Sequence, residues 1–241
     1  MNYSSDERGT PMFQGFSKET GDFLWELSFH NERPWFLEHK EQFERCLNTP
    51  FKELAKETAE RLQARFPEMD VQVHVSRIYR DARRLFGRGP YKDHLWFTVK
   101  DGAHYAEGPM FWFEIHPATY SYGLGYFDVT PAEMELFRAS IDANPAQFRR
   151  LAARIAGFKG FQVIGPEYAR PKGSYEEPIR SWYNRKRVGV EAKRDLGGDA
   201  FSPALPELLC DSFEKLMPMY EYLHRVHRMA GEAAPEGKSH G

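Results

Sequence analysis

The densest group of charged side chains in the sequence lies between Arg77 and Lys92. This stretch holds six Lys or Arg residues against one acid, Asp81, whereas the whole chain of 241 residues has 33 Lys and Arg against 35 Asp and Glu. One carboxylate neutralises one cation, and the surplus guanidinium groups suit bidentate contacts with phosphate or carboxylate. The pattern therefore predicts a site for a phosphorylated or carboxylated small molecule, with these binding residues: Arg77, Arg80, Arg83, Tyr91 and Lys92.

Asp81 and His94 are the candidates for acid–base catalysis in such a site. A carboxylate and an imidazole can each transfer a proton, and neighbouring arginines would stabilise developing negative charge. The alternative is a structural network in which Asp81 and the arginines fix a loop to a strand, in an interaction protein without catalysis. Arg84 and Arg88 are interpreted as ordinary solvated charges. The residue types name neither a reaction nor a cofactor.

A second basic stretch, residues 180–194, mixes cations with Trp182 and Tyr183. Basic residues interleaved with aromatic residues can bind nucleic acid through phosphate contacts and base stacking. The alternative is a solvated helix face with the tryptophan in the core, which the formal net charge of −2 favours. A nucleic-acid-binding module is therefore the runner-up interpretation, through these cations: Arg180, Arg185, Lys186 and Arg187.

Two further groups give weaker indications. Glu114 and His116 share one face of a predicted strand, where they could transfer a proton or bind a metal. One pair without a third ligand does not predict a metal site. Gly123 and Gly125 lie within an aromatic strand, which favours close backbone packing over nucleotide binding.

Several classes of protein lose support because their motifs are missing. The sequence contains no Walker-type phosphate loop, no G-x-S-x-G, no H-E-x-x-H and no C-x-x-C. Two distant cysteines, Cys46 and Cys210, favour a reducing compartment. With no long apolar run, the sequence predicts a cytoplasmic protein and no membrane segment.

The elements that position these residues follow from hydrophobic spacing. Three helices are expected first, at about 18–29, 32–43 and 50–66, with Ser17, Asn31 and Thr49 as their N-caps. A period of two, clearest at Val71, Val73 and Val75, then predicts strands at 71–75, 94–100, 110–116 and 119–128. The connections between these strands are short, which favours antiparallel pairing.

Helices return after the strands. Thr130 and Glu133 form a capping box, and Asn144 caps the next helix. A short strand at 161–164, a helix at 177–187 and a last helix at about 202–229, bent at Pro218, complete the pattern. The fold class expected is α+β, with a central antiparallel sheet of about four to five strands flanked by N-terminal and C-terminal helices. One domain is expected over residues 13–230, between flexible tails at 1–12 and 231–241.

At these positions the chain resembles the domain of unknown function 2461 family, from about Phe16 to Val226. The resemblance is carried by an N-terminal group (Phe23-Leu24, Leu27, Asn31, Trp35-Phe36, Lys40, Phe43) and a central group (Arg77-Ile78, Arg80-Asp81, Arg83, Pro90-Tyr91-Lys92). The chain departs from the family pattern at His30, where a second asparagine is usual. The resemblance implies a single bacterial-type cytoplasmic domain and supplies no activity.

Overall fold

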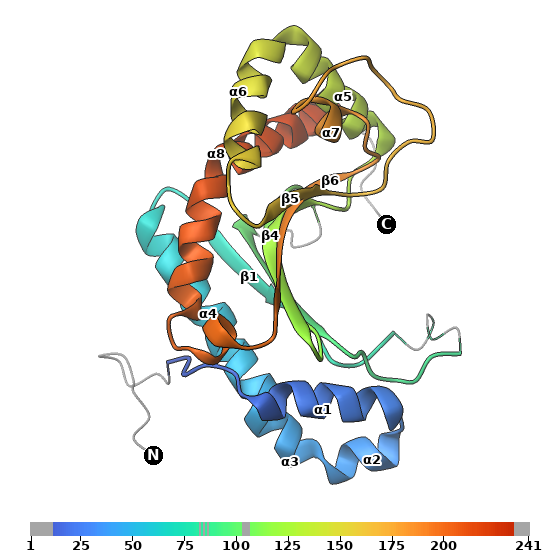
Figure 1. Cartoon of the computed structure of the whole chain (residues 1–241), viewed down its shortest axis with the longest axis vertical. Coiled ribbons are helices and arrows are strands. Elements are labelled where there is room, and N and C mark those ends of the chain that lie inside the picture. The colour runs from blue at the N-terminus through green and yellow to red at the C-terminus, as the bar shows by residue number, and fades with distance from the viewer. Residues whose placement is uncertain (1–11, 82, 84, 86, 103–106, 234–241) are drawn as a thin grey trace. The chain divides into compact units, whose positions relative to one another are not determined.

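The computed structural model describes residues 12–81, 83, 85, 87–102 and 107–233; Arg84 and most of the two predicted tails lie outside these ranges. Helices come first, strands next and helices again, so the α+β class is confirmed (Figure 1). One antiparallel sheet contains six strands in the order β1-β2-β3-β4-β6-β5. The predicted number of about four to five strands is therefore wrong.

The strands are β1 (Val71–Val75), β2 (Leu95–Asp101), β3 (Met110–Ile115), β4 (Thr119–Tyr126), β5 (Phe161–Ile164) and β6 (Val188–Asp195). The α-helices are α1 (Lys18–Phe29), α2 (Arg33–Glu38), α3 (Lys40–Phe43), α4 (Thr49–Arg65), α5 (Pro131–Ala143), α6 (Pro145–Ala156), α7 (Arg180–Tyr183) and α8 (Leu205–Ala233). A π-helical segment, η1 (Glu44–Asn48), leads into α4, and a 3-10 helix, η3 (Gly198–Phe201), precedes α8. No helix in the described ranges is both long enough and apolar enough to cross a membrane.

The chain divides into two compact units, which are described in turn. Within the described ranges the first unit comprises residues 12–102, 111–122 and 193–213, and the second comprises 107–110, 123–192 and 214–233. The single domain expected over 13–230 stays a prediction.

In the first unit, α1 begins as predicted. Ser17 and Thr20 form its capping box, and Phe23, Leu24 and Leu27 are buried along one face. Asn31, by contrast, is not a helix cap, because Glu32 precedes α2. Its side chain binds a backbone segment 60 residues away instead.

Thr49 is also not an N-cap, although α4 begins at this residue, close to the predicted start. Asn48 and Thr49 both have right-handed helical backbone angles, and the helical chain continues from η1 into α4. Pro50 has no N–H to offer the carbonyl of Cys46, four residues earlier. The hydroxyl of Thr20 donates to that carbonyl at 2.7 Å, which joins α1 to η1.

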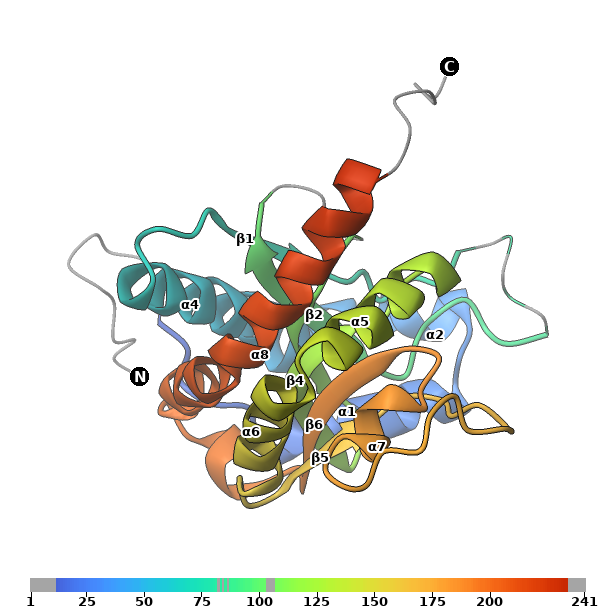
Figure 2. The same cartoon turned by 90° about the horizontal axis from the view of Figure 1, so that it is seen from above.

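The two faces of the sheet in the first unit differ in character. Phe97 and Phe113 are paired on β2 and β3, and the ring of Phe51 from α4 packs edge-on against Phe97 at 5.6 Å. Figures 1 and 2 show α4 beside β1. Trp96 and Glu114, which are also paired, lie on the opposite face. One face therefore belongs to the core, and the other carries the polar residues of interest.

β1 is the first strand in the sheet order, and among the described strands it has a partner on one side only. Val71 and Val75 are half-buried as predicted, but Val73 is 41% exposed. The alternation of apolar residues predicted the strand correctly. It overstated the burial of the middle residue, Val73, because a strand at the edge of a sheet has neighbours on fewer sides.

In the second unit, the capping box of α5 is confirmed. Thr130 Oγ1 accepts a hydrogen bond from the Glu133 N–H at 3.2 Å, and the Glu133 carboxylate accepts one from the Thr130 N–H at 2.7 Å. Asn144 caps α6 through the Gln147 N–H at 3.1 Å, also as predicted. Gly123 is required for packing, because a Cβ there would collide with the carbonyl oxygen of Val190.

The helix predicted at 177–187 is mostly wrong. Only Arg180–Tyr183 is helical, and β6 begins at Val188. On β6, every second residue is buried, namely Val188, Val190 and Ala192. This alternation is typical of a strand, and the prediction of a basic helix overlooked it. The last helix also starts later than predicted, at Leu205, and it continues through Pro218 to Ala233.

Candidate functional site

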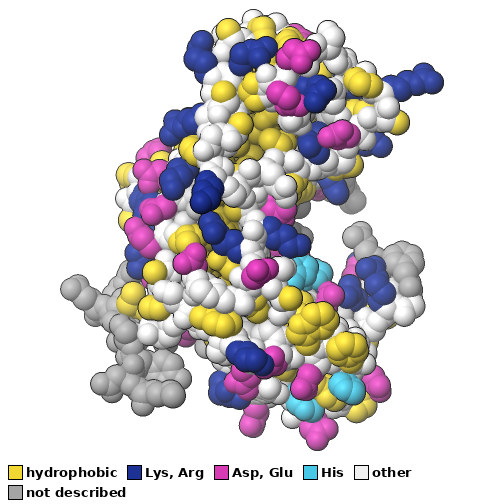
Figure 3. Space-filling model, viewed as in Figure 1, with side chains coloured by type: hydrophobic (Ala, Val, Ile, Leu, Met, Phe, Trp, Pro, Cys, Tyr) yellow, Lys and Arg dark blue, Asp and Glu magenta, His cyan; other side chains and the backbone are white. Residues whose placement is uncertain are grey.

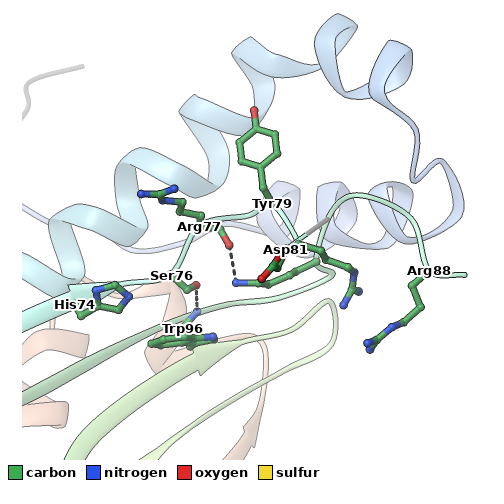
Figure 4. A pocket seen from close by; sticks show the side chains of 9 residues that line it. His74, Ser76, Arg77, Tyr79, Asp81, Arg88 and Trp96 are labelled. Atoms are coloured by element: carbon green, nitrogen blue, oxygen red, sulfur yellow. Dashed lines mark hydrogen bonds between the residues drawn. The ribbon is translucent and has the colours of Figure 1, made fainter. Parts of the chain in front are cut away.

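A pocket of about 820 Å³ lies in the first unit where β1 ends and β2 begins (Figure 4). Four cationic side chains line it, Arg77, Arg80, Arg88 and Lys92, together with one carboxylate, that of Asp81. The rest of the lining comes from His74, Ser76, Tyr79 and Trp96. Most of the predicted basic cluster is therefore brought to one pocket, which we call the cationic pocket.

The loop that carries these residues is fixed at its base by backbone pairing. The Arg80 N–H donates to the Pro90 carbonyl and the Lys92 N–H donates to the Ile78 carbonyl, each at 2.8 Å. Asn31 fixes the second limb, because its amide donates to the Tyr91 carbonyl at 3.0 Å and accepts from the Tyr91 N–H at 2.9 Å.

Tyr91 is an anchor of this loop rather than part of the pocket wall. Its side chain is 3% exposed and its ring stacks on Phe36 at 4.2 Å. It does not appear in the pocket lining, although the sequence suggested a ligand-binding role. Burial raises the pKa of the phenol.

Lys92 lies against the floor of the cationic pocket. Its Nζ donates to the Arg77 carbonyl at 2.7 Å and lies 5.8 Å from the centre of the Trp96 ring. Burial lowers the pKa of Lys92, and the charge of Arg80 lowers it further, while Glu114 acts in the opposite direction. The part of this lowering that comes from Arg80 shows that the ammonium and this guanidinium lie close enough to repel each other.

Arg80 is held from outside the pocket. Its Nε donates to the Tyr91 carbonyl at 2.7 Å, and its Nη2 lies 3.6 Å from Oδ1 of Asp93. Asp81, the carboxylate next to it in sequence, pairs with Arg83 instead, at 2.9 Å. Arg83 has a side chain 88% exposed and is not part of the pocket lining.

Arg77 and Arg88 form the two ends of the cationic pocket. Figure 4 shows Arg77 and Arg88 on opposite sides of the residues that line the pocket. Neither guanidinium has an ion pair or hydrogen bond with any residue in the described part of the chain. Arg88, which the sequence suggested was an ordinary solvated charge, thus belongs to the site. Arg88 reaches the pocket because the loop after Asp81 turns back toward β2, and the spacing of residues along the sequence does not reveal such a turn.

His94 lies beside the cationic pocket and not in its wall. Its Nδ1 is 2.9 Å from Oδ1 of Asp93, and its Nε2 is 3.5 Å from Oε1 of Glu114. Both ring nitrogens therefore face carboxylates. The acid–base candidates Asp81 and His94 are thus separated, with Asp81 in the pocket wall and His94 behind it.

Glu114 is shared by two imidazoles. His116 Nε2 lies 3.4 Å from the same oxygen that faces His94, and the two imidazole rings stack at 5.1 Å. Burial opposes ionisation of Glu114, but the hydrogen bond from His116 and the charges of both histidines hold its pKa below the usual value. The same hydrogen bond raises the pKa of His116 against the effect of burial. Among the residues described, no group of three or more His, Cys, Asp or Glu side chains is arranged so that it could hold a metal ion.

The second basic stretch lies in the second unit, except for its end, and several of its groups have internal partners. Arg180 pairs with Glu177 at 2.9 Å, and Arg185 donates to the Ser181 carbonyl at 2.7 Å. Lys186 lies 5.8 Å from the centre of the Tyr168 ring, and Arg187 is exposed. Trp182 and Tyr183 are buried. Buried rings cannot stack on nucleobases, so these two residues do not provide the base-stacking surface that the nucleic-acid interpretation requires.

Comparisons with known proteins place the whole site inside one family. No match to the chain was found among curated proteins. The family model described as conserved hypothetical protein (DUF2461) matches residues 19–222, a range that contains every residue lining the cationic pocket. The chain therefore belongs to the DUF2461 family of conserved hypothetical proteins.

Proposed function

We propose that this protein binds a phosphorylated or carboxylated small molecule in the cationic pocket. The observation that carries the proposal is the charge of the lining, which has four cations and a single carboxylate among the described residues. That carboxylate, Asp81, is already paired with Arg83 outside the pocket. The lining therefore keeps a positive surplus, and an anionic ligand is the partner that would neutralise it.

The remaining lining suits the uncharged part of such a ligand. His74 and Trp96 lie with their ring centres 5.5 Å apart, on the polar side of β1 and β2. Aromatic rings of this kind provide a flat apolar wall, while the arginines bind the anionic group. Ser76 adds a hydroxyl, although that hydroxyl already accepts from the Trp96 N–H at 2.9 Å.

His94 acts in this proposal as a positioning residue. It holds Asp93, and Asp93 holds Arg80 at the pocket wall. Of the predicted acid–base pair, Asp81 lines the pocket and His94 does not. The candidates for proton transfer are therefore Asp81 together with His74 and Lys92, which also line it.

The test is a binding measurement with defined anions. Inorganic phosphate, adenosine monophosphate, citrate and succinate are titrated into the protein by calorimetry, with a thermal-shift measurement in parallel. At least one of them should bind and stabilise the protein. Arg88→Ala should weaken that binding by roughly ten-fold, since a hydrogen bond to a charged group contributes about 1.5–3 kcal/mol.

Arg228→Ala is the matched control. Arg228 is an exposed arginine of α8 outside the pocket, and its replacement changes the net charge by the same amount. The proposal fails if none of the anions binds, or if Arg228→Ala weakens binding as much as Arg88→Ala does.

A further inference from the structure

A second, smaller pocket of the first unit lies on the other side of Asp93. Its volume is about 260 Å³. Trp25 and Ser28 of α1, the turn between β3 and β4 that begins at His116, and Lys193 of β6 line it together with Asp93. From the composition of this lining, we propose that the pocket binds one ring of a neutral carbohydrate.

Trp25 supplies the platform for that ring. Its side chain is 48% exposed, and the ring of Phe29 stacks on it at 6.2 Å and so supports its orientation. Figure 3 shows hydrophobic side chains exposed over α1, with histidine side chains next to them. An indole face held open in this way suits the flat, apolar C–H face of a sugar ring.

The polar groups around the platform are both donors and acceptors. Lys193 has no ion pair with any residue described, so its three N–H groups are available. The Asp93 carboxylate contacts both His94 and Arg80 through Oδ1, and a carboxylate can accept further hydrogen bonds. His116 faces Glu114 through Nε2, which leaves Nδ1 available. Hydroxyl groups can bind to all three, because a hydroxyl both donates and accepts.

The charges of this pocket are balanced, in contrast to those of the cationic pocket. In the lining, Lys193 provides a positive charge and Asp93 a negative charge, while His116 is paired with Glu114. A balanced site offers no net attraction to an anion. Its volume is slightly below the ordinary range for ligand pockets, about 300–1,000 Å³, and so suits a single ring. These features favour a neutral polyhydroxylated ligand.

This inference does not depend on the proposed anion binding. Arg80 lines the cationic pocket and Asp93 lines the smaller one, and these two residues contact each other. The two pockets have no lining residue in common. One can therefore fail without the other.

Saturation-transfer NMR on the full chain tests the inference. The probes are the methyl glycosides of glucose, galactose, mannose and N-acetylglucosamine, with adenosine as an aromatic probe and inorganic phosphate as an anion. At least one glycoside should receive magnetisation at its ring C–H protons. Trp25→Ala should weaken its binding by roughly ten-fold, and Lys193→Ala should also weaken it.

Phe201→Ala is the matched control, because it removes another exposed aromatic ring of the first unit that does not line the pocket. It should keep most of the glycoside signal, and phosphate should leave that signal unchanged. The inference is overturned if no glycoside gives a signal, if only adenosine does, or if Trp25→Ala binds glycosides as well as the unmodified protein. A signal lost on adding phosphate would also overturn it, since the sugar would then occupy the cationic pocket.

Discussion

The guanidinium of Arg80 lies 3.6 Å from the carboxylate of Asp93, not beside its sequence neighbour Asp81. Asp81 turns outward to Arg83, and Asp93 reaches back from the other limb of the loop. The contact therefore joins the two limbs at the wall of the cationic pocket. The two carboxylates therefore have different roles: Asp93 holds Arg80 in place, whereas Asp81 lines the pocket.

A double-mutant cycle can measure this partnership. Arg80→Ala and Asp93→Ala should show a coupling of about 0.5 kcal/mol in the free energy of unfolding, since Asp93 is about half-exposed and water screens the pair. The cycle of Arg80→Ala with Asp81→Ala should show almost none. Urea denaturation gives both values, and a larger coupling with Asp81 would contradict the arrangement.

The link between Asn31 and the pocket loop leads to a second prediction. Asn31→Ala removes two hydrogen bonds to the backbone of the buried residue Tyr91. We expect a loss of about 1–3 kcal/mol in the free energy of unfolding. We also expect weaker binding of whichever anion binds the cationic pocket, because the loop base loses its fixed position.

Asn144→Ala is the control for that experiment. It removes the N-cap of α6 and should cost about 1 kcal/mol, yet leave anion binding unchanged. If both asparagine variants weaken anion binding equally, the loss reflects general destabilisation and not the loop.

Two buried threonines provide a matched pair. The Thr20 hydroxyl donates to the Cys46 carbonyl, whereas the Thr58 hydroxyl is buried without a hydrogen-bond partner among the described residues. Thr20→Val should destabilise the protein by about 1–2 kcal/mol, and Thr58→Val should be neutral or stabilising. Thermal and urea unfolding of the two variants measure the difference. Equal effects would mean that the carbonyl left free by Pro50 has little influence on stability.

The pair of Glu114 and His116 predicts a pH dependence of stability. His116 has a raised pKa, so its contribution is fully present below the ordinary value of 6.5 and is lost as the pH rises through the raised value. Glu114 has a lowered pKa, so its contribution is present above 4.5 and is lost as the pH falls through the lowered value.

The stability that His116→Gln loses should therefore be greatest between pH 4.5 and 6.5. It should shrink on both sides of this window. Unfolding by urea at a series of pH values checks the shape of the curve. A difference that stays constant with pH would show that the two side chains do not form a charged pair.

The elements that the sequence predicted well are those with strong local signals. The capping box of Thr130 and Glu133 and the cap of Asn144 involve residues three apart, so short segments contain all the information. The strand β6 was missed because the charges of its neighbourhood suggested a solvated helix, although the alternation of Val188, Val190 and Ala192 was present.

The site itself depends on contacts that local patterns do not encode. The basic cluster could be predicted from composition, but the pairing of Arg80 with Asp93 and the inclusion of Arg88 follow from where the loop returns. Asn31 has the residue type of a helix cap, and only the fold shows that it binds a distant backbone segment instead.

The amide of Asn31 also determines which residue type position 89 can hold. A Cβ on Gly89 would overlap the amide and the Cβ of Asn31, so any larger residue must displace that side chain from Tyr91. Gly89 has no left-handed backbone angle that would demand glycine, and the requirement is therefore one of space. A mutation as small as the addition of one methyl group at this position would therefore disturb the loop through Asn31, a residue that does not line the cationic pocket.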